Sequence, residues 1–303
     1  MLELIIGSPA LFVLVVFAFA LLLGSFLNVV IYRLPVMMQR DWREQCTELA
    51  EMPNDLPTEA REGQRFDLIV PRSRCRNCGR QITALQNIPV LSYLVLGGRC
   101  AGCKQPISPR YPIVELATGV LCGTVAWHFG FGWEALFGIV LTLFLIPVTM
   151  IDFDHQLIPD ATVLPLVWIG LLLSLFHPVA GQTRCSSRPG TRPATRSRRR
   201  APGYLSLWSV YQLFKLITGK EGMGYGDFKL LAALGAWLGW QQLPIIILMS
   251  AVVGAAVGIS LIVFRGRDRQ IPIPFGPYLA AAGWITMLWG EQIRNLYFDF
   301  AFA

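Results

Sequence analysis

The chain has 303 residues, of which 54% are hydrophobic and only 15% are charged. This composition is far more apolar than that of a typical soluble domain, and several uncharged segments are long enough to cross a bilayer. The sequence therefore predicts an all-α, polytopic membrane protein. The formal net charge is +7, and seven arginines within residues 182–202 account for it, so a generally basic surface is excluded.

The first apolar segment, residues 10–31, is predicted to be a retained transmembrane helix. It is too long for the apolar region of a cleavable signal, no basic stretch precedes it, and no small-residue cleavage site follows it. We expect residues 1–35 to form this first helix and its flanks.

We expect about eight transmembrane helices in all. Two further segments, residues 135–151 and 243–264, are as free of charge as the first. The weaker candidates are residues 111–127, 161–176, 203–218, 230–240 and 274–289. Residues 230–240 are short for a full span.

The segment between the first two helices, residues 36–110, is predicted to be a cytosolic domain. Residues 32–110 hold 12 Lys and Arg, and such residues concentrate in cytoplasmic loops. This places the N-terminus outside, and alternation through eight helices places Asp152 and Asp227 at cytosolic helix ends. We expect residues 111–303 to form the membrane-embedded core.

Four cysteines in that insertion predict a metal site. Two C-x2-C pairs are separated by 21 residues, and each pair is able to place two thiolates on one ion from a tight turn. The ligands are Cys75, Cys78, Cys100 and Cys103. Four thiolates leave no open position, so the prediction is structural zinc. Asn77 and Gly102 are expected to supply the permissive backbone of the turns.

Two alternatives compete with this metal site. A pair of disulfides would use the same cysteines, but a cytosolic location disfavours it. Zinc knuckles also bind nucleic acid, but the arginines nearby suit a cytosolic loop beside anionic lipid, so we expect no nucleic acid partner. Cys122 is expected to be a small apolar helix residue, and Cys46 and Cys185 have no partner at a useful spacing.

Two carboxylates mark a candidate catalytic centre. Asp152 ends one apolar run, and Asp227 joins a glycine-rich turn to another. Carboxylates at membrane depth are costly, and two on one side of the bilayer indicate a paired-carboxylate protease. Asp227 is expected near a helix N-terminus. Gly222, Gly224 and Gly226 are expected to allow close approach of the backbone and positive φ angles.

The carboxylates have other interpretations. Asp152 and Asp227 are also explained as helix-cap residues at the membrane interface. For Asp154 three roles remain open: a helix cap, a supporting residue, or the catalytic partner of Asp227 in place of Asp152. Asp160 is expected to be an N-cap residue. Glu115 is a candidate for a polar contact within the bundle. A proton-coupled transporter is the main rival function, but it favours carboxylates at helix centres and inverted repeats, which we do not find.

Residues 182–202 depart abruptly from their flanks. They carry seven arginines and no acid, yet the topology places them outside, against the charge rule. A nucleic acid or anionic lipid site and an unstructured loop are two explanations. The third, which we favour, is a short reading-frame error, so that the tract is not native sequence.

Several motifs together resemble one family, the bacterial type IV prepilin peptidases, or prepilin leader peptidase/N-methyltransferases. Besides the four cysteines, Asp152 and the Gly-x-Gly-Asp motif at residues 224–227, the motifs are residues 24–35, 87–93, 110–115, 157–160 and 272–278. The resemblance covers nearly the whole chain and resumes at Gly203 after the arginine-rich tract.

The resemblance implies an aspartic protease of the bacterial inner membrane with its active site facing the cytosol. Such enzymes remove the basic leader from type IV prepilins and pilin-like secretion subunits, and many then N-methylate the new terminus with S-adenosylmethionine. By position, the catalytic pair is Asp152 and Asp227, supported by Gly224 and Gly226. Gln86 replaces a glutamate found in many members, so the resemblance supports proteolysis more strongly than methyl transfer.

The acidic residues before the cysteines have two interpretations. They either attract the basic leader of the substrate or belong to a solvated loop of mixed charge. These residues are Glu44, Glu48, Glu51, Asp55, Glu59 and Glu62.

Overall fold

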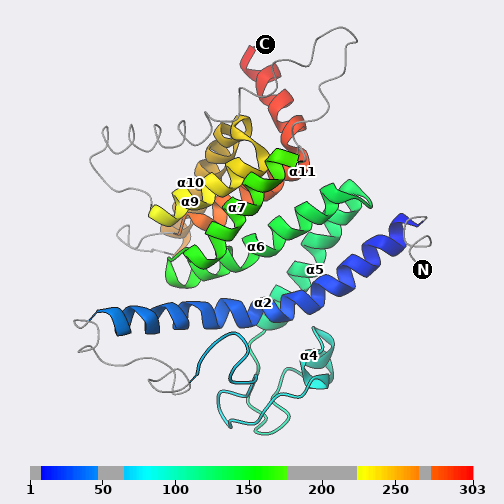
Figure 1. Cartoon of the computed structure of the whole chain (residues 1–303), viewed down its shortest axis with the longest axis vertical. Coiled ribbons are helices and arrows are strands. Elements are labelled where there is room, and N and C mark those ends of the chain that lie inside the picture. The colour runs from blue at the N-terminus through cyan, green and yellow to red at the C-terminus, as the bar shows by residue number, and fades with distance from the viewer. Residues whose placement is uncertain (1–7, 47–64, 177–223, 266–273, 303) are drawn as a thin grey trace. The chain divides into compact units, whose positions relative to one another are not determined.

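The computed structural model describes residues 8–46, 65–176, 224–265 and 274–302. Their regular secondary structure is helical, with isolated β-bridges in place of strands (Figure 1). The α-helices are α2 (Pro9–Gln45), α4 (Leu91–Val95), α5 (Arg110–Phe129), α6 (Trp133–His155), α7 (Asp160–Phe176), α9 (Tyr225–Leu238), α10 (Leu243–Arg265) and α11 (Gly276–Phe302). Two short 3-10 helices are η2 (Leu85–Asn87) and η4 (Trp240–Gln242). The all-α prediction is confirmed for the described residues.

The chain divides into two compact units, residues 1–147 and 148–303. The first holds α2, α4, α5 and most of α6, and the second holds the end of α6 and the helices after it. Each candidate site lies within one unit.

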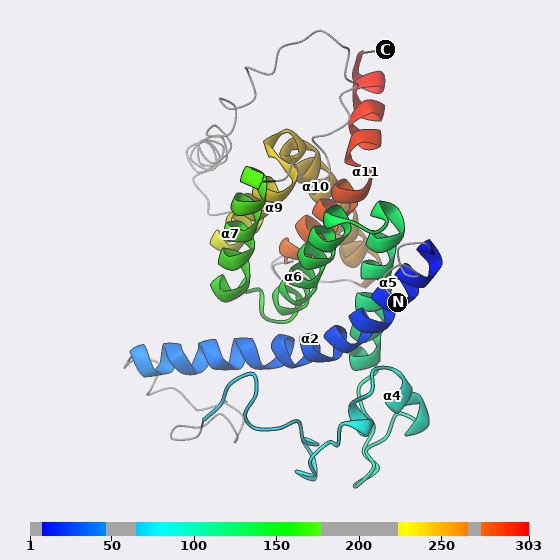
Figure 2. The same ribbon diagram turned by 45° about the vertical axis from the view of Figure 1, so that its right-hand side comes forward.

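Small residues bring α2 and α5 close together in the first unit (Figure 2). A Cβ atom on Gly24 would lie 2.9 Å from the Cα of Glu115, and one on Gly119 would lie 2.9 Å from Leu21 and Phe17. Close contact at small residues is the usual way that apolar helices associate in a membrane.

Helix α2 is longer than the segment that we predicted. Ser8 accepts the N–H of Leu11 as its N-cap, and Pro9 occupies the first turn, where a missing N–H is harmless. The helix then continues through Pro35 and ends at Gln45, before Cys46. The apolar run predicted the start of α2, but not the polar turns at its end.

Arg33 fixes the loop after the undescribed residues 47–64 to α2. Its buried guanidinium donates to the carbonyl oxygens of Asp67 at 2.7 Å and Pro71 at 2.5 Å, and it lies over the ring of Phe66. A buried cation needs such partners, because an unpaired one would lose its hydration without compensation.

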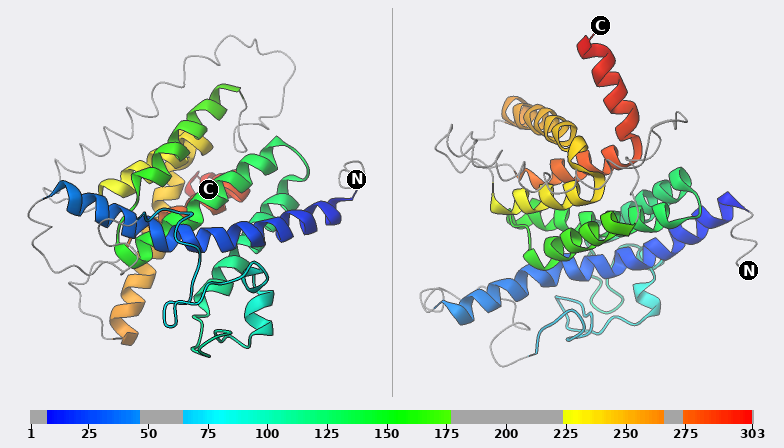
Figure 3. Two further views of the ribbon diagram at one scale, coloured as in Figure 1. Left: turned by 60° about the horizontal axis from the view of Figure 1, so that its bottom comes forward. Right: turned by 45° about the horizontal axis from the view of Figure 1, so that its top comes forward.

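In the second unit, α7 packs against α9, and α10 against α11 (Figure 3). The indole N–H of Trp237 donates to the carbonyl oxygen of Leu166 at 2.8 Å, and Gly170 leaves room for the same ring. Helix α11 has a kink at Trp289, where we expected the last span to end. Trp237 thus gives α9 a directional contact with α7.

Four described helices are long and apolar enough to cross a membrane. They are Pro9–Gln45, Arg110–Phe129, Trp133–His155 and Trp240–Leu261, and Asp160–Ser174 is a shorter apolar helix. Eight spans are therefore not confirmed. The predicted helix 203–218 and the anomalous tract 182–202 lie outside the described residues.

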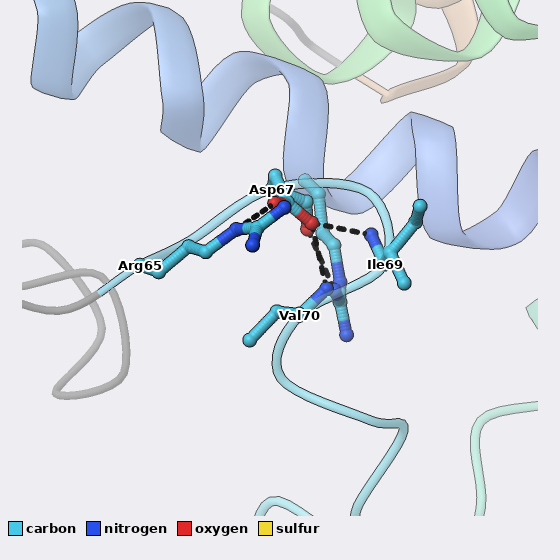
Figure 4. A network of polar contacts seen from close by, with 5 residues as sticks. Arg65, Asp67, Ile69 and Val70 are labelled. Carbon is cyan, nitrogen blue, oxygen red and sulfur yellow. Dashed lines mark hydrogen bonds and ion pairs between the residues drawn. The ribbon is translucent and has the colours of Figure 1, made fainter.

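Asp67 organises the loop that Arg33 holds (Figure 4). Its carboxylate accepts the backbone N–H groups of Val70 and Ile69, both at 2.7 Å, and the Arg65 guanidinium at 2.8 Å. The hydrogen bonds from Val70, Ile69 and Arg65 lower the pKa of Asp67 to about 2. Because the folded pKa is depressed, this stabilisation is present above the ordinary carboxyl pKa and is lost as pH falls through about 2.

We predict that Asp67→Ala removes the hydrogen-exchange protection of the Ile69 and Val70 amides. Arg65→Gln, the control, keeps both backbone bonds and should retain most of that protection. In the wild type, protection should persist at pH 4 and fall as pH approaches 2. Equal protection in wild type and Asp67→Ala would show that the carboxylate does not hold this turn.

Candidate active site and metal centre

The four predicted cysteine ligands converge in the first unit. Their sulfur atoms all lie within 4.8 Å of one another, and those of Cys75 and Cys103 are 3.8 Å apart. Four sulfurs around a tetrahedral zinc ion are separated by roughly 3.8 Å. The cluster therefore fits one metal ion, and all four cysteines are free of disulfides.

The two C-x2-C pairs form equivalent turns. The N–H of Cys75 donates to Arg80 and that of Cys100 to Gln105, each at 2.9 Å. An antiparallel bridge closes each turn, Arg74 with Gln81 and Arg99 with Pro106. Since each pair repeats the same backbone pattern, the two turns present their sulfurs to one point.

The permissive backbone positions differ from our prediction. Positive φ angles occur at Gly79 (69°) and Lys104 (60°), the residue after the second cysteine of each turn, and not at Asn77 or Gly102. Gly79 adopts this conformation without steric cost, whereas Lys104 is strained by its Cβ atom. The sequence pattern predicted the turns but placed the left-handed residue too early in both of them.

In the second turn, hydrogen bonds favour the thiolate form that binds metal, whereas in the first turn desolvation and the neighbouring cysteines raise the pKa of the Cys78 thiol to about 11. The backbone of Gln105, followed by the side chain of Asn77, hydrogen-bonds Cys103 and lowers the pKa of its thiol to about 6. Hydrogen bonds from the backbone of Cys103 and Gly102 lower the pKa of Cys100. Such donors stabilise negative sulfur, so the described residues suit a cation.

The other cysteines lie apart from this cluster. Cys122 is fully buried in α5, as expected for a small apolar residue, and Cys46 is the exposed C-cap residue of α2. Cys185 lies outside the described residues.

We predict that Gly79→Ala weakens metal retention by about tenfold, because alanine at this φ is strained by roughly 1–2 kcal/mol. Lys104→Gly is the matched variant at the equivalent position, and it should strengthen retention because it relieves the same strain. The measurement is the chelator concentration that removes half of the bound metal. Equal retention in all three proteins would contradict this account of the turns.

Asp152 and Asp227 meet in the second unit. Asp152 lies in the last turn of α6 and is 5% exposed, and Asp227 lies in the first turn of α9 and is 8% exposed. The two groups are close enough for the charge of Asp152 to act on Asp227. The predicted position of Asp227 at a helix N-terminus is confirmed.

Their oxygen atoms have different surroundings. Oδ2 of Asp152 accepts the backbone N–H of Gly276 at 3.0 Å in a buried hydrogen bond. Oδ1 of Asp227 is buried and has no hydrogen-bond partner among the described residues. A buried carboxyl oxygen without a protein partner is available to bind water or a substrate group.

The glycines before Asp227 have one of the two properties that we expected. A Cβ atom on Gly226 would lie 2.7 Å from the Cβ of Ile158, so close approach is confirmed. The prediction of positive φ angles is wrong, because Gly224 has φ −63° and Gly226 is not in the left-handed region. Gly222 lies outside the described residues.

Nearby polar residues are more exposed than the pair. Asp154 and His155 are exposed at the end of α6. Asp160 is the first residue of α7 and not its N-cap, and its carboxylate accepts Lys229 Nζ at 2.6 and 2.8 Å. The ion pair of Lys229 with Asp160 connects the first residue of α7 with the second turn of α9.

We predict that Lys229→Met and Asp160→Asn each lower the free energy of unfolding by less than about 1 kcal/mol, because the pair is exposed. The double variant should lose no more than the larger single effect. Exchanging the two residues, as Lys229→Asp with Asp160→Lys, should restore wild-type stability in detergent. Additive losses would show that the two groups are energetically independent.

Two further sequence features have clear structural roles. Glu115 of α5 is buried and accepts the N–H of Val90, which precedes α4, at 2.8 Å. It also hydrogen-bonds the side chain of Ser25 in α2, so the predicted polar contact within the bundle is confirmed. Val90 has φ 58°, unusual for a branched residue, and the bond from its N–H to Glu115 helps to hold it. Oε1 of Gln86 accepts the N–H of Thr83 at 3.3 Å, a contact that a glutamate would also make.

The fold and sites thus define a helical membrane protein with a cluster of four cysteines and a buried pair of carboxyl groups. Residues 18–129 match the model of the bacterial peptidase A24 N-terminal domain, and residues 139–259 match the type IV leader peptidase family. No solved structure gave a significant match.

Relatives similar to this chain share nearly its whole length. A prepilin leader peptidase/N-methyltransferase of Stutzerimonas stutzeri is 53% identical over 99% of this chain and 98% of its own. Proteins of the same name from Pseudomonas aeruginosa (49% identical; 99% and 98%) and Aeromonas salmonicida (51%; 98% and 97%) are also similar. The chain belongs to the type IV leader peptidase family.

Proposed function

We propose that this protein is an aspartic endopeptidase that removes the basic leader from type IV prepilins and pilin-like secretion subunits. The observation that carries the proposal is the buried pair of Asp152 and Asp227, from two helices far apart in the sequence. Membership of the family and the printed names of the relatives support the substrate class.

The proposed chemistry needs one ionised and one protonated carboxyl group. Two neighbouring carboxylates do not both ionise readily, so they share a proton. The ionised group takes a proton from water, and the resulting hydroxide adds to the scissile carbonyl carbon while the other carboxyl donates a hydrogen bond to the carbonyl oxygen. Collapse of the tetrahedral intermediate breaks the C–N bond, and the new amine leaves with a proton from the pair.

The surroundings of the two groups favour distinct roles. The backbone N–H of Gly276 orients Asp152, which suits the carboxylate that activates water. The unpartnered Oδ1 of Asp227 suits the group that contacts the scissile carbonyl. Asp154 is a weaker alternative partner of Asp227, because its side chain is exposed whereas Asp152 and Asp227 are both buried.

The second proposed activity is N-methylation of the new N-terminal residue. The relatives carry N-methyltransferase in their names, and S-adenosylmethionine supplies the methyl group in such reactions. The described residues contain no strand–glycine loop–helix unit, so we assign no residue to this cofactor and derive no step from it. The contact of Gln86 gives no reason to exclude the activity.

We propose zinc as the metal bound by the cluster of four cysteines, in a structural role. Cys75, Cys78, Cys100 and Cys103 would hold it, and four thiolates leave no open position for substrate. Cysteine substitution should therefore impair folding or methylation more than peptide-bond chemistry.

We infer a multi-pass protein of the bacterial inner membrane, with the N-terminus outside and the active site facing the cytosol. The concentration of Lys and Arg between α2 and α5 supports this orientation. The substrate would then present its basic leader on the cytosolic side and its apolar helix to the lipid. Glu44 pairs with Arg40, and the other acidic candidates for leader attraction lie outside the described residues.

The transporter that we weighed as an alternative is not supported. Both carboxylates lie in the end turns of their helices, and the similar relatives are named as peptidases. No further function is needed to explain the pair.

We predict that Asp152→Asn and Asp227→Asn each reduce prepilin cleavage by at least about 1,000-fold, because either change removes the shared proton or the base. Asp154→Asn is the matched control and should cleave within about threefold of the wild type. The measurement is leader cleavage of a purified prepilin in detergent by protein of confirmed membrane insertion.

Other outcomes of this assay have distinct meanings. Cleavage at the wild-type rate by Asp152→Asn together with loss in Asp154→Asn would move the first catalytic carboxyl to Asp154. Wild-type cleavage by Asp227→Asn would overturn the proposed pair. If the wild type itself fails to cleave, resequencing of the gene across residues 182–202 precedes rejection of the family assignment.

A further inference from the structure

Gly276 approaches Asp152 from a distant part of the chain. It is the first residue of α11, and its backbone N–H donates to Oδ2 of Asp152 across 124 positions of sequence. The first N–H groups of a helix have no partner within the helix, so this donor is free to bond a side chain. Gly276 itself is buried.

Space, and not backbone conformation, explains the glycine at this position. A Cβ atom on Gly276 would lie 2.6 Å from Oδ2 of Asp152, 3.0 Å from its Cγ and 3.1 Å from Cδ1 of Ile158. Gly276 is not among the described residues with positive φ. Any larger residue would therefore displace the carboxylate or the start of α11.

Ile158 connects this contact with the other half of the pair. This half-buried residue of the α6–α7 link also fills the space at Gly226, next to Asp227. The first turns of α9 and α11 therefore both approach this side chain, each at a glycine.

We propose that Gly276 is a positioning residue for Asp152. Its N–H fixes the orientation of the carboxylate, and its lack of a side chain permits the approach that the bond requires. The inference rests on the proposed peptidase function. It assigns a catalytic consequence to the segment at residues 274–278, whose role was not predicted from the sequence.

The first test is the steady-state kinetics of Gly276→Ala. Displacement of Asp152 should lower kcat on the order of 100-fold and leave KM within about twofold, because binding of the leader does not require the carboxylate to be aligned. Gly283→Ala is the matched control on the same helix, since its Cβ would lie 2.6 Å from Leu234, about two turns of α9 beyond Asp227, and its nearest neighbours include neither carboxyl group. It should leave kcat within about twofold.

A second variant separates the two contacts of the added methyl group. Ile158→Val removes Cδ1 and so relieves the contact of that methyl group with Ile158, but not the one with Asp152. The double variant Gly276→Ala with Ile158→Val should therefore remain as slow as Gly276→Ala alone. Restoration of kcat by Ile158→Val would show that Gly276 serves packing against Ile158 and would overturn the proposal.

A thermal unfolding cycle covers the case in which Gly276→Ala is too unstable for kinetics. In an Asp152→Ala background the carboxylate is gone, so Gly276→Ala should lower Tm much less than it does in the wild type. An equal loss of Tm in both backgrounds would overturn the proposal.

The proposed function is controlled separately by Asp152→Asn. Wild-type cleavage by Asp152→Asn would refute the catalytic pair. Slow Asp152→Asn together with a normal kcat for Gly276→Ala would refute the positioning role alone.

Discussion

The structure of the second unit depends on the burial of two carboxyl groups among apolar helix ends. Each group loses most of its hydration, and the charge of one acts on the other. Such an arrangement persists only where the backbone supplies hydrogen bonds and the neighbouring segments come close enough to exclude water. The backbone N–H of Gly276 supplies a hydrogen bond to Asp152. The absence of a side chain at Gly226 allows Ile158 to pack closely beside Asp227.

The cluster of four cysteines lies in a part of the first unit that has little regular secondary structure. Residues 65–109 contain only short helices and β-bridges, so they bury little apolar surface of their own. Four converging cysteines, and the contacts of Arg33 with the loop at Asp67, supplement the small hydrophobic cluster of Phe66 and Val36. The cysteine cluster is therefore consistent with a structural metal site in the first unit, and the carboxyl pair with a catalytic site in the second unit.

Sequence reasoning predicted the elements whose physical signal is local. Uncharged runs indicated the positions of α2, α6 and α10, and cysteine spacing indicated the members of the cysteine cluster. It failed where a tertiary contact decides the outcome. The ion pair of Asp160 with Lys229 replaced the expected cap, and the left-handed residues of the turns fell at Gly79 and Lys104. Ile158 and Gly276 carry no local signal, because their importance arises only when α6, α9 and α11 meet.

The central claim is that Asp152 and Asp227 work as one unit with a single shared proton. The most direct measurement is the dependence of kcat on pH for prepilin cleavage in detergent. The account predicts a bell-shaped profile, because cleavage requires one ionised and one protonated carboxyl group. A profile with a single limb, or one that does not change with pH across the stability range of the protein, would contradict it.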